Sequence, residues 1–305
     1  MRHVFIINPI AGRHDASASI TSKVQEYFSS HGGDYEIILT EAPLHAMEIA
    51  KREAASGDGV RLYACGGDGT LNEVIRGAFG FENAEIAAVP TGSGNDYIKV
   101  FGTREQFLNL PALIEGITMR VDLVRCGERL GCNILSAGFD SEVAYHMARF
   151  KNMPLVSGHL AYTLAVFYCL IRKTKNSFEV QIDSEPPIKH DFTLVACLNG
   201  ICYGGGYSPV PSASVTDGTL DFVLAGTISR LKFVKLLNSC KIGRLDDLHG
   251  VITYSRGTKI HICSETPFAV NIDGECHTSV DVLFEVLPQT MSFVLPKGLV
   301  NTRKP

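Results

Sequence analysis

The first 120 residues alternate between short apolar runs and stretches in which apolar residues recur at helical spacing. Ile20, Val24 and Phe28 give one such helical stripe, and Pro43 opens another helix. Val4–Ile7 is a continuous apolar run that predicts a strand, and further strands are expected at Tyr35–Leu39, Val60–Ala64 and Ile86–Val89. Strands that alternate with helices are typical of an α/β domain, a parallel sheet with helices on both faces.

The pattern changes after about residue 122. Helical stretches are expected near 140–150, 157–173 and 228–240, but runs typical of strands dominate. These runs are Phe178–Ile182, Phe192–Leu198, Leu220–Leu224, Lys259–Cys263, Phe268–Ile272, Val282–Leu287 and Ser292–Leu295. They predict a mainly antiparallel β-sandwich, and therefore two domains with an α+β class overall. We expect an α/β domain at 1–122, joined by the tail 296–305, and a β-rich domain at 123–295.

Composition narrows the class of protein. The 305 residues are 45% hydrophobic and 20% charged, as in a globular protein, and a net charge of −4 argues against a broad nucleic-acid surface. The nine cysteines show no metal-ligand spacing, and no signal peptide precedes the first strand, so a cytoplasmic protein with reduced thiols is expected. The apolar segment Leu155–Ile171 is short for a membrane span, so a core helix is favoured.

Three glycine-rich turns follow predicted strands, at residues 8–12, 66–70 and 90–96. Loops at the carboxyl ends of parallel strands converge, and glycine lets main-chain N–H groups approach phosphate oxygens. One such loop is more often a plain tight turn, but three in one α/β unit indicate a phosphate site. None of them has the Walker pattern.

Two further signals lie in these loops. Thr70-x-x-Glu73 reads as a capping box at a helix start, and Ser93-x-x-Asp96 reads as a weaker one. Carboxylates such as Asp68 and Asp96 would repel phosphates unless a cation intervenes, which argues for Mg²⁺ between protein and nucleotide.

The segments GGDGTLNEV (66–74) and PTGSGND (90–96) resemble the diacylglycerol kinase catalytic domain of bacterial soluble lipid kinases, which are related to sphingosine and ceramide kinases. The resemblance extends over nearly the whole chain, through NPIAG (8–12), VDL (121–123), SAGFD (136–140), YGGG (203–206), the stretch from Pro211 to Asp221 and IDGE (272–275). One departure is Ser93, where the family usually has threonine; the hydroxyl is kept.

The resemblance implies a nucleotide pocket between the two domains. Its expected lining is Asn8, Thr40, Gly66, Gly67, Asp68, Gly69, Thr70, Glu73, Thr91, Gly92 and Ser93. Asp68, Asp96 and Asp122 would form a water-linked network that holds the catalytic Mg²⁺; by itself, Asp122 would be taken for a solvated strand end.

The resemblance also assigns roles in the second half of the chain. Glu275, with Asp68, would be catalytic, and Glu275 would accept the proton of the lipid hydroxyl. Without the family, Asp273-Gly274 is a hairpin turn and Glu275 a surface residue. Asp217, with main-chain oxygens of Ser214 and Thr219, would hold a structural Mg²⁺, and a plain turn is an equal alternative.

The implied reaction is ATP- and Mg²⁺-dependent transfer of the γ-phosphoryl group to a lipid hydroxyl, with diacylglycerol as the expected acceptor and phosphatidic acid as the product. Such an enzyme would touch the inner membrane face peripherally and transiently, and its edge strands could pair in a homodimer. Rival interpretations are an NAD kinase, which shares the Gly-Gly-Asp-Gly-Thr loop, a kinase for a sphingoid base, ceramide or glycolipid, and a catalytically silent nucleotide-binding regulator.

Overall fold

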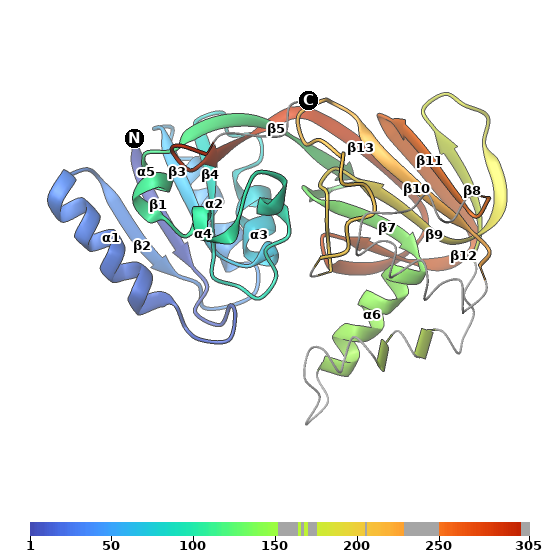
Figure 1. Ribbon diagram of the computed structural model, residues 1–305, viewed down its shortest axis with the longest axis horizontal. Coiled ribbons are helices and arrows are strands. Elements are labelled where there is room, and N and C mark those ends of the chain that lie inside the picture. Colours follow the sequence, from blue (N-terminus) through green and yellow to red (C-terminus); the bar gives the residue numbers. More distant parts are fainter. Residues whose placement is uncertain (152–163, 166–167, 170–175, 205, 229–249, 300–305) are drawn as a thin grey trace. The chain divides into compact units, whose positions relative to one another are not determined.

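The computed structural model describes residues 1–151, 164–165, 168–169, 176–204, 206–228 and 250–299 (Figure 1). The chain divides into two compact units. Unit 1 comprises Met1–Leu123, Val215–Asp217 and the chain from Leu287 onward, and unit 2 comprises Val124–Ser214 and Gly218–Val286.

Unit 1 is built on a parallel sheet in which the strand order is β13-β4-β3-β1-β2. Its strands are β1 (Arg2–Ile7), β2 (Tyr35–Leu39), β3 (Val60–Gly66), β4 (Ala84–Pro90) and the C-terminal part of β13 (Glu275–Leu295). Its helices are α1 (Ser17–His31), α2 (His45–Ala54), α3 (Asp68–Ala78), the 3-10 turn η1 (Tyr97–Val100), α4 (Arg104–Phe107) and α5 (Leu110–Ile114). The four strands predicted in this region are confirmed.

The strand order explains where the helices lie. The chain steps from β1 outward to β2 and then back across β1 to β3, so right-handed connections put α1 and α2 on opposite faces. The contacts agree, because α2 packs on α3 and α1 packs on α5 (Figure 1). Phe5 and Tyr63 stack at 4.1 Å between ring centroids on neighbouring strands and are fully buried.

Unit 2 contains an antiparallel sheet in which the strand order is β11-β10-β9-β7-β12-β13. The elements are β5 (Ile117–Cys126, which begins in unit 1), β6 (Arg129–Gly131), β7 (Ile134–Gly138), α6 (Phe139–Lys151), β8 (Asn176–Ile182), β9 (Ile188–Leu198), β10 (Leu220–Gly226), β11 (Ile252–Gly257), β12 (Lys259–Ile272) and β13. The long strands β9 and β12 each pair with β8 along one part and with β7 along another, so the strands close around a common core. Phe178, Phe222 and Phe284 are fully buried in that core.

Several strands differ from the sequence expectation. Lys259–Cys263 and Phe268–Ile272 are two parts of one strand, β12, whose register shifts between Cys263 and Phe268. Pro267 lies at this irregularity and lacks the N–H that a regular ladder needs. Likewise, β13 runs through both predicted segments 282–287 and 292–295. The strands β6, β7 and β11 were not predicted, and of β5 only a strand end at Asp122 was expected.

Helix α6 confirms the helix expected near 140–150, whereas those expected at 157–173 and 228–240 lie almost wholly outside the described residues. Within the described part of the chain, no helix is both long enough and apolar enough to cross a bilayer. All the described cysteines are free thiols. Cys126 and Cys197 are among the buried ones in unit 2.

Candidate functional site

The three glycine-rich loops meet at the carboxyl ends of the unit 1 strands. The amide of Asn8 donates to the carbonyl of Cys65 at 2.9 Å, and its side-chain Nδ2 donates to Thr70 Oγ1 at 3.1 Å. The amides of Thr91 and Gly92 both donate to the carbonyl of Gly66, at 3.0 and 2.9 Å. Hydrogen bonds therefore tie the first and third loops to the second.

Two glycines are required by the close approach of the second and third loops. A Cβ on Gly92 would lie 2.4 Å from Gly67 Cα, and a Cβ on Gly67 would lie 2.9 Å from the carbonyl oxygen of Gly94. Both distances are shorter than real side chains tolerate, and the opposing atoms are backbone. The glycines thus set the shape of the cradle as well as leaving room for a ligand.

Asp68 holds the third loop in place. Its two carboxylate oxygens each accept the amide of Asp96 at 2.9 Å, and Oδ1 also accepts the amide of Tyr97 at 3.2 Å. The amide of Asp68 donates to the carbonyl of Gly94 at 3.0 Å. Asp96 is buried, and its carboxylate receives Lys99 Nζ at 2.6 Å, a partner that the sequence motif did not reveal.

Both predicted capping boxes are wrong. Helix α3 begins at Asp68 after the N-cap residue Gly67, so Thr70 lies inside the first turn, and Ser93 precedes no helix because the 3-10 turn starts at Tyr97. Glu73 instead accepts the amide of Ala46 at 3.2 Å. That amide belongs to the first turn of α2, whose own N-cap residue provides no side-chain hydrogen bond, so Glu73 supplies the missing cap.

The cradle has the features of an anion site. Among the first-turn amides of α3, those of Gly69 and Thr70 lack partners within the helix, as at every helix start. A Cβ on Gly69 would meet nothing within 4 Å, so open space lies beside this turn. The hydroxyl oxygen of Thr91 is buried and has no hydrogen-bond partner among the described residues, so it remains able to bind a ligand. Amides, a helix start and a hydroxyl together suit phosphate oxygens.

The remaining nucleotide candidates lie around these loops. Thr40 follows β2, and its amide donates to the carbonyl of Ile7 at 2.8 Å. Ser93 is exposed at the tip of the third loop.

Asp122 lies on β5 and is fully buried, which contradicts a solvated strand end. Its Oδ1 accepts the amide of Gln289 at 2.7 Å, and its own amide donates to the carbonyl of Val215 at 2.7 Å. Asp217 lies two residues after Val215 in the chain, in the turn that contains Gly218 at φ 70°. Ser214 and Thr219 flank this turn, and the Thr219 hydroxyl accepts Arg256 Nη2 at 2.7 Å.

The carboxylates of this region determine how Mg²⁺ could bind. Among the described residues, no group of three His, Cys, Asp or Glu side chains is gathered closely enough to hold a metal directly. Mg²⁺ commonly binds through one or two carboxylates, several waters and the phosphates of its nucleotide. The neighbouring Asp68 and Asp96 fit that water-linked arrangement and do not form an all-protein cage.

Glu275 is exposed at the start of β13, directly after the turn Asp273-Gly274. Both turn residues have positive φ, 49° and 97°, and Ile272 pairs with Glu275 across them. The segment is therefore a two-residue hairpin of the kind that Asp-Gly favours. A hairpin and a catalytic carboxylate are compatible here, because the turn fixes the direction of the next side chain.

Asp273 has a role that its motif does not show. Its carboxylate accepts the amides of Cys132, Asn133 and Ile134, at 2.6, 3.1 and 2.9 Å. Burial raises the pKa of Asp273 above its usual value, while these three hydrogen bonds act in the opposite direction. Asp273 thus ties this hairpin, on which Glu275 lies, to the residues at the start of β7. The signal available in the sequence was the Asp-Gly turn alone.

Comparisons with known proteins agree with this architecture. The family described as "Diacylglycerol kinase catalytic domain" matches residues 2–126, and the family described as "YegS C-terminal NAD kinase beta sandwich-like domain" matches residues 133–295. Among curated proteins, the chain is 26% identical over 298 residues to a diacylglycerol kinase of Bacillus subtilis, covering 96% of this chain and 95% of that protein.

Another relative is a probable lipid kinase YegS-like of Pseudomonas putida, 28% identical over 254 residues and covering 81% of this chain and 80% of that protein. Among solved structures, a putative diacylglycerol kinase from Bacillus anthracis superposes with a TM-score of 0.76 at 22% identity, covering 98% of both chains. At that identity the superposition supports the fold alone.

Proposed function

Because this chain belongs to the diacylglycerol kinase catalytic-domain family and is a lipid kinase, we propose that it transfers the γ-phosphoryl group of ATP to a hydroxyl of a membrane lipid, with diacylglycerol as the leading acceptor. The observation that carries the proposal is the cradle of three loops, in which Asp68 and the paired glycines hold main-chain amides around open space at the start of α3. That arrangement suits a triphosphate.

In the proposed reaction the bond between the γ-phosphorus and its β-bridging oxygen breaks, and a bond from phosphorus to the lipid oxygen forms. The lipid proton passes to the carboxylate of Glu275, and ADP leaves. Asp68 and Asp96 would hold Mg²⁺ through water, with Asp122 as the third member of the network. When bound, Mg²⁺ supplies positive charge that offsets the charge on the phosphates.

The chain's own residues do the positioning. The amides of Gly69 and Thr70 and the hydroxyl of Thr91 would orient phosphate oxygens, and Asn8, through Thr70, would fix the first loop against them. Glu275 would act as general base, a task for which a carboxylate must lie within hydrogen-bond reach of the acceptor oxygen. The turn at Asp217, with Ser214 and Thr219, is proposed as a separate structural Mg²⁺ site without a chemical role.

The test is a radiolabelled ATP transfer assay over diacylglycerol, ceramide, a sphingoid base, a glycolipid and NAD, with and without Mg²⁺. We expect Mg²⁺-dependent labelling of diacylglycerol. Glu275→Gln should lower transfer at least about 100-fold while nucleotide affinity stays unchanged. Glu265→Gln is the matched control, since Glu265 is an exposed acid of unit 2 that pairs with Lys189.

Each contrary result has a distinct meaning. Normal turnover by Glu275→Gln removes Glu275 as the base. Labelling of NAD in place of every lipid would establish an NAD kinase. ATP binding without turnover on any acceptor would establish a nucleotide-binding regulator. Vesicle co-sedimentation and light scattering on the same protein would test the expected peripheral membrane contact and homodimer.

A further inference from the structure

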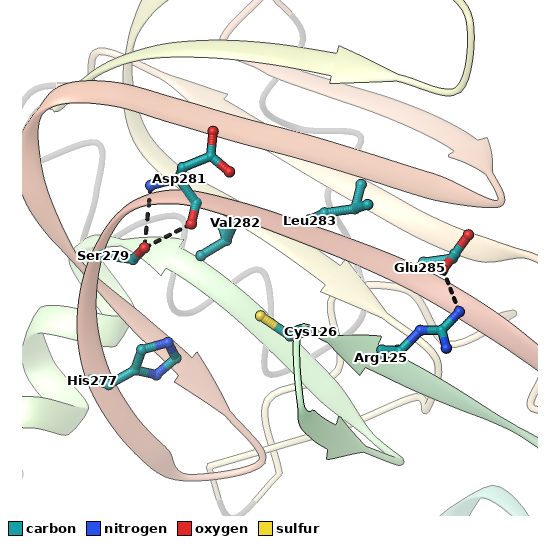
Figure 2. Close-up of a pocket in the computed structure, with 9 residues that line it drawn as sticks. Arg125, Cys126, His277, Ser279, Asp281, Val282, Leu283 and Glu285 are labelled. Carbon is teal, nitrogen blue, oxygen red and sulfur yellow. Dashed lines mark hydrogen bonds and ion pairs between the residues drawn. The ribbon is translucent and has the colours of Figure 1, made fainter.

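Unit 2 contains a pocket of 490 Å³ whose residues come from β5 and from a bent part of β13 (Figure 2). The β5 side contributes Arg125, Cys126 and Gly127, and the β13 side contributes His277, Ser279, Asp281, Val282, Leu283 and Glu285. Its volume lies in the range of small-molecule sites. None of these residues belongs to the set expected from the sequence motifs.

The pocket lies beside the proposed base. Side chains two residues apart on a strand point to the same face, so Glu275 and His277 share one face of β13. The two side chains are close enough for the charge of Glu275 to act on the His277 imidazole. A molecule in this pocket would therefore have part of its structure near Glu275.

The charges of the lining argue against an anionic occupant. Arg125 Nη2 pairs with Glu285 Oε2 at 2.8 Å within the pocket wall (Figure 2), and Asp281 Oδ2 contacts His261 Nε2 at 2.9 Å. One arginine against two carboxylates leaves an excess of negative charge, which disfavours phosphate groups. The pocket is thus unsuited to the nucleotide or to an anionic head group.

Its uncharged groups suit a neutral polar molecule. Burial raises the pKa of the Cys126 thiol to about 11, so this thiol stays uncharged at neutral pH. Burial also lowers the pKa of His277, and a neutral imidazole offers one donor and one acceptor. The Nδ1 atom of His277 is buried without a partner among the described residues, so Nε2 is the nitrogen left to serve a ligand. Val282 and Leu283 add apolar surface.

We propose that this pocket is the acceptor-side subsite of the lipid kinase reaction and that it takes an uncharged, hydroxyl-bearing head group, with His277 hydrogen-bonded to a hydroxyl next to the one that is phosphorylated. The inference rests on the proposed function, because Glu275 is the base only in that reaction. The carboxylates, the arginine and the imidazole of the lining can form hydrogen bonds with neighbouring hydroxyls of such a head group, while the apolar side chains contact its carbon atoms. Acceptors with a second free hydroxyl should therefore gain from the pocket.

The test compares monoacylglycerol with diacylglycerol, since the former has one more free hydroxyl. The measured quantity is kcat/KM for monoacylglycerol divided by kcat/KM for diacylglycerol. This ratio is compared between each variant and the wild type, so that the partition of the lipids into micelles cancels. One neutral hydrogen bond predicts that His277→Phe lowers the ratio about fivefold. His277→Gln, which keeps a polar atom near the position of Nε2, should restore most of it. His190→Phe on β9, an exposed histidine outside the pocket, should not change it.

A second measurement does not depend on transfer. Saturation-transfer NMR with glycerol and methyl β-glucoside as probes should give a signal with wild-type protein and His190→Phe, and none with His277→Phe. Leu283→Trp is the alternative variant if His277→Phe does not fold. Leu283 lines the pocket and is 41% exposed, so a larger side chain there should fill the pocket without disturbing the core.

The outcomes separate the two proposals. Probe binding without phosphorylation of any lipid would overturn the proposed function and leave the pocket as a polyol site. Phosphorylation with an unchanged ratio in His277→Phe and Leu283→Trp, or without any probe signal, would overturn the subsite.

Discussion

The two units carry their functional groups in different ways. In unit 1 the candidate site is made mainly of main chain: the first-turn amides of α3 lie in a cradle of three loops, which is held by Asp68 and by glycines whose replacement would overlap with backbone. In unit 2 the candidate groups are side chains, Glu275 and His277, on the face of one strand. A site made of main chain fails when its shape changes, whereas a site made of side chains fails when their chemistry changes.

The units also differ in the desolvated titratable group that each contains. Unit 1 has a half-buried histidine, His3, whose Nδ1 lies 2.8 Å from Tyr63 Oη. Unit 2 has a desolvated carboxylate, Asp273, bonded to three consecutive amides. Burial opposes the charged form in both cases, but one group gains its charge on protonation and the other loses it. The two units should therefore respond to acid with opposite sign.

The largest expected effect comes from three glycine substitutions that separate shape from ligand space. Gly92→Ala places a Cβ 2.4 Å from Gly67 Cα, so we expect about 3 kcal/mol lower stability and at least about tenfold weaker nucleotide binding. Gly69→Ala meets nothing within 4 Å, so stability should hold while nucleotide affinity falls. Gly59→Ala, which also meets nothing and lies before β3, should change neither.

These variants are compared by urea unfolding and by calorimetric titration with an ATP analogue. Equal nucleotide affinity in Gly69→Ala and Gly59→Ala would mean that the space beside α3 is not where phosphate binds.

The next effect is the acid response of unit 1. Burial, with a smaller contribution from the charge of Arg61, lowers the pKa of His3 to about 4, whereas an unfolded histidine titrates near its ordinary value of 6.5. The unfolded chain then binds the proton more readily, so stability present above pH 6.5 is lost as the pH falls through 4. Partial exposure reduces the full linkage value, and we expect a loss of about 2 kcal/mol.

Asp273 should act in the other direction on unit 2. Its raised folded-state pKa stabilises the fold below the ordinary value of 3.8, and this stabilisation disappears as the pH rises through the folded-state pKa. Amide hydrogen exchange at pH 7 and pH 5 resolves the units separately. His3→Gln should flatten the response of unit 1 and leave that of unit 2 unchanged. An equal response of unit 1 in the wild type and in His3→Gln would refute the assignment to His3.

The sequence also predicts the two units to different extents. In unit 1, short and mostly apolar runs locate β1 to β4, and glycine-rich turns after β1, β3 and β4 locate the cradle, because both signals are local. The helix starts were misplaced, because capping patterns at Thr70 and Ser93 compete with the tertiary hydrogen bonds that Asp68 makes. Likewise, the bond from Ala46 to Glu73 joins residues of two helices and leaves no local trace.

In unit 2 the signals are weaker. Strand β12 is interrupted near Pro267, so one strand reads as two, and β13 bends through exposed residues that break the apolar pattern. The anchoring of Asp273 depends on amides about 140 positions earlier in the chain, and a lone histidine such as His277 has no spacing partner. Long-range pairing decides these features, and periodicity does not encode it.

A smaller effect tests the anchor of the Glu275 hairpin. Asp273→Asn keeps the oxygen that accepts Asn133 and Ile134 but turns an amide toward the N–H of Cys132, so we expect a loss of about 1 kcal/mol in the free energy of unfolding. Asparagine tolerates positive φ in an Asx-Gly hairpin, so the turn itself should persist. Transfer activity should fall modestly with unchanged nucleotide affinity. A loss of nucleotide binding would show that the hairpin influences the cradle.

The smallest effect decides whether Glu73 touches the nucleotide or positions the loops. Its carboxylate accepts the Ala46 amide at the start of α2, where negative charge is favourable. Glu73→Gln keeps an acceptor and removes the charge, so stability should fall by about 0.5 kcal/mol while nucleotide affinity changes less than about twofold. Glu48→Gln, an exposed acid in the first turn of the same helix, is the control for charge alone. A tenfold loss of nucleotide affinity in Glu73→Gln with unchanged stability would instead make Glu73 a direct nucleotide contact, and the cradle of unit 1 would then depend on side-chain chemistry as unit 2 does.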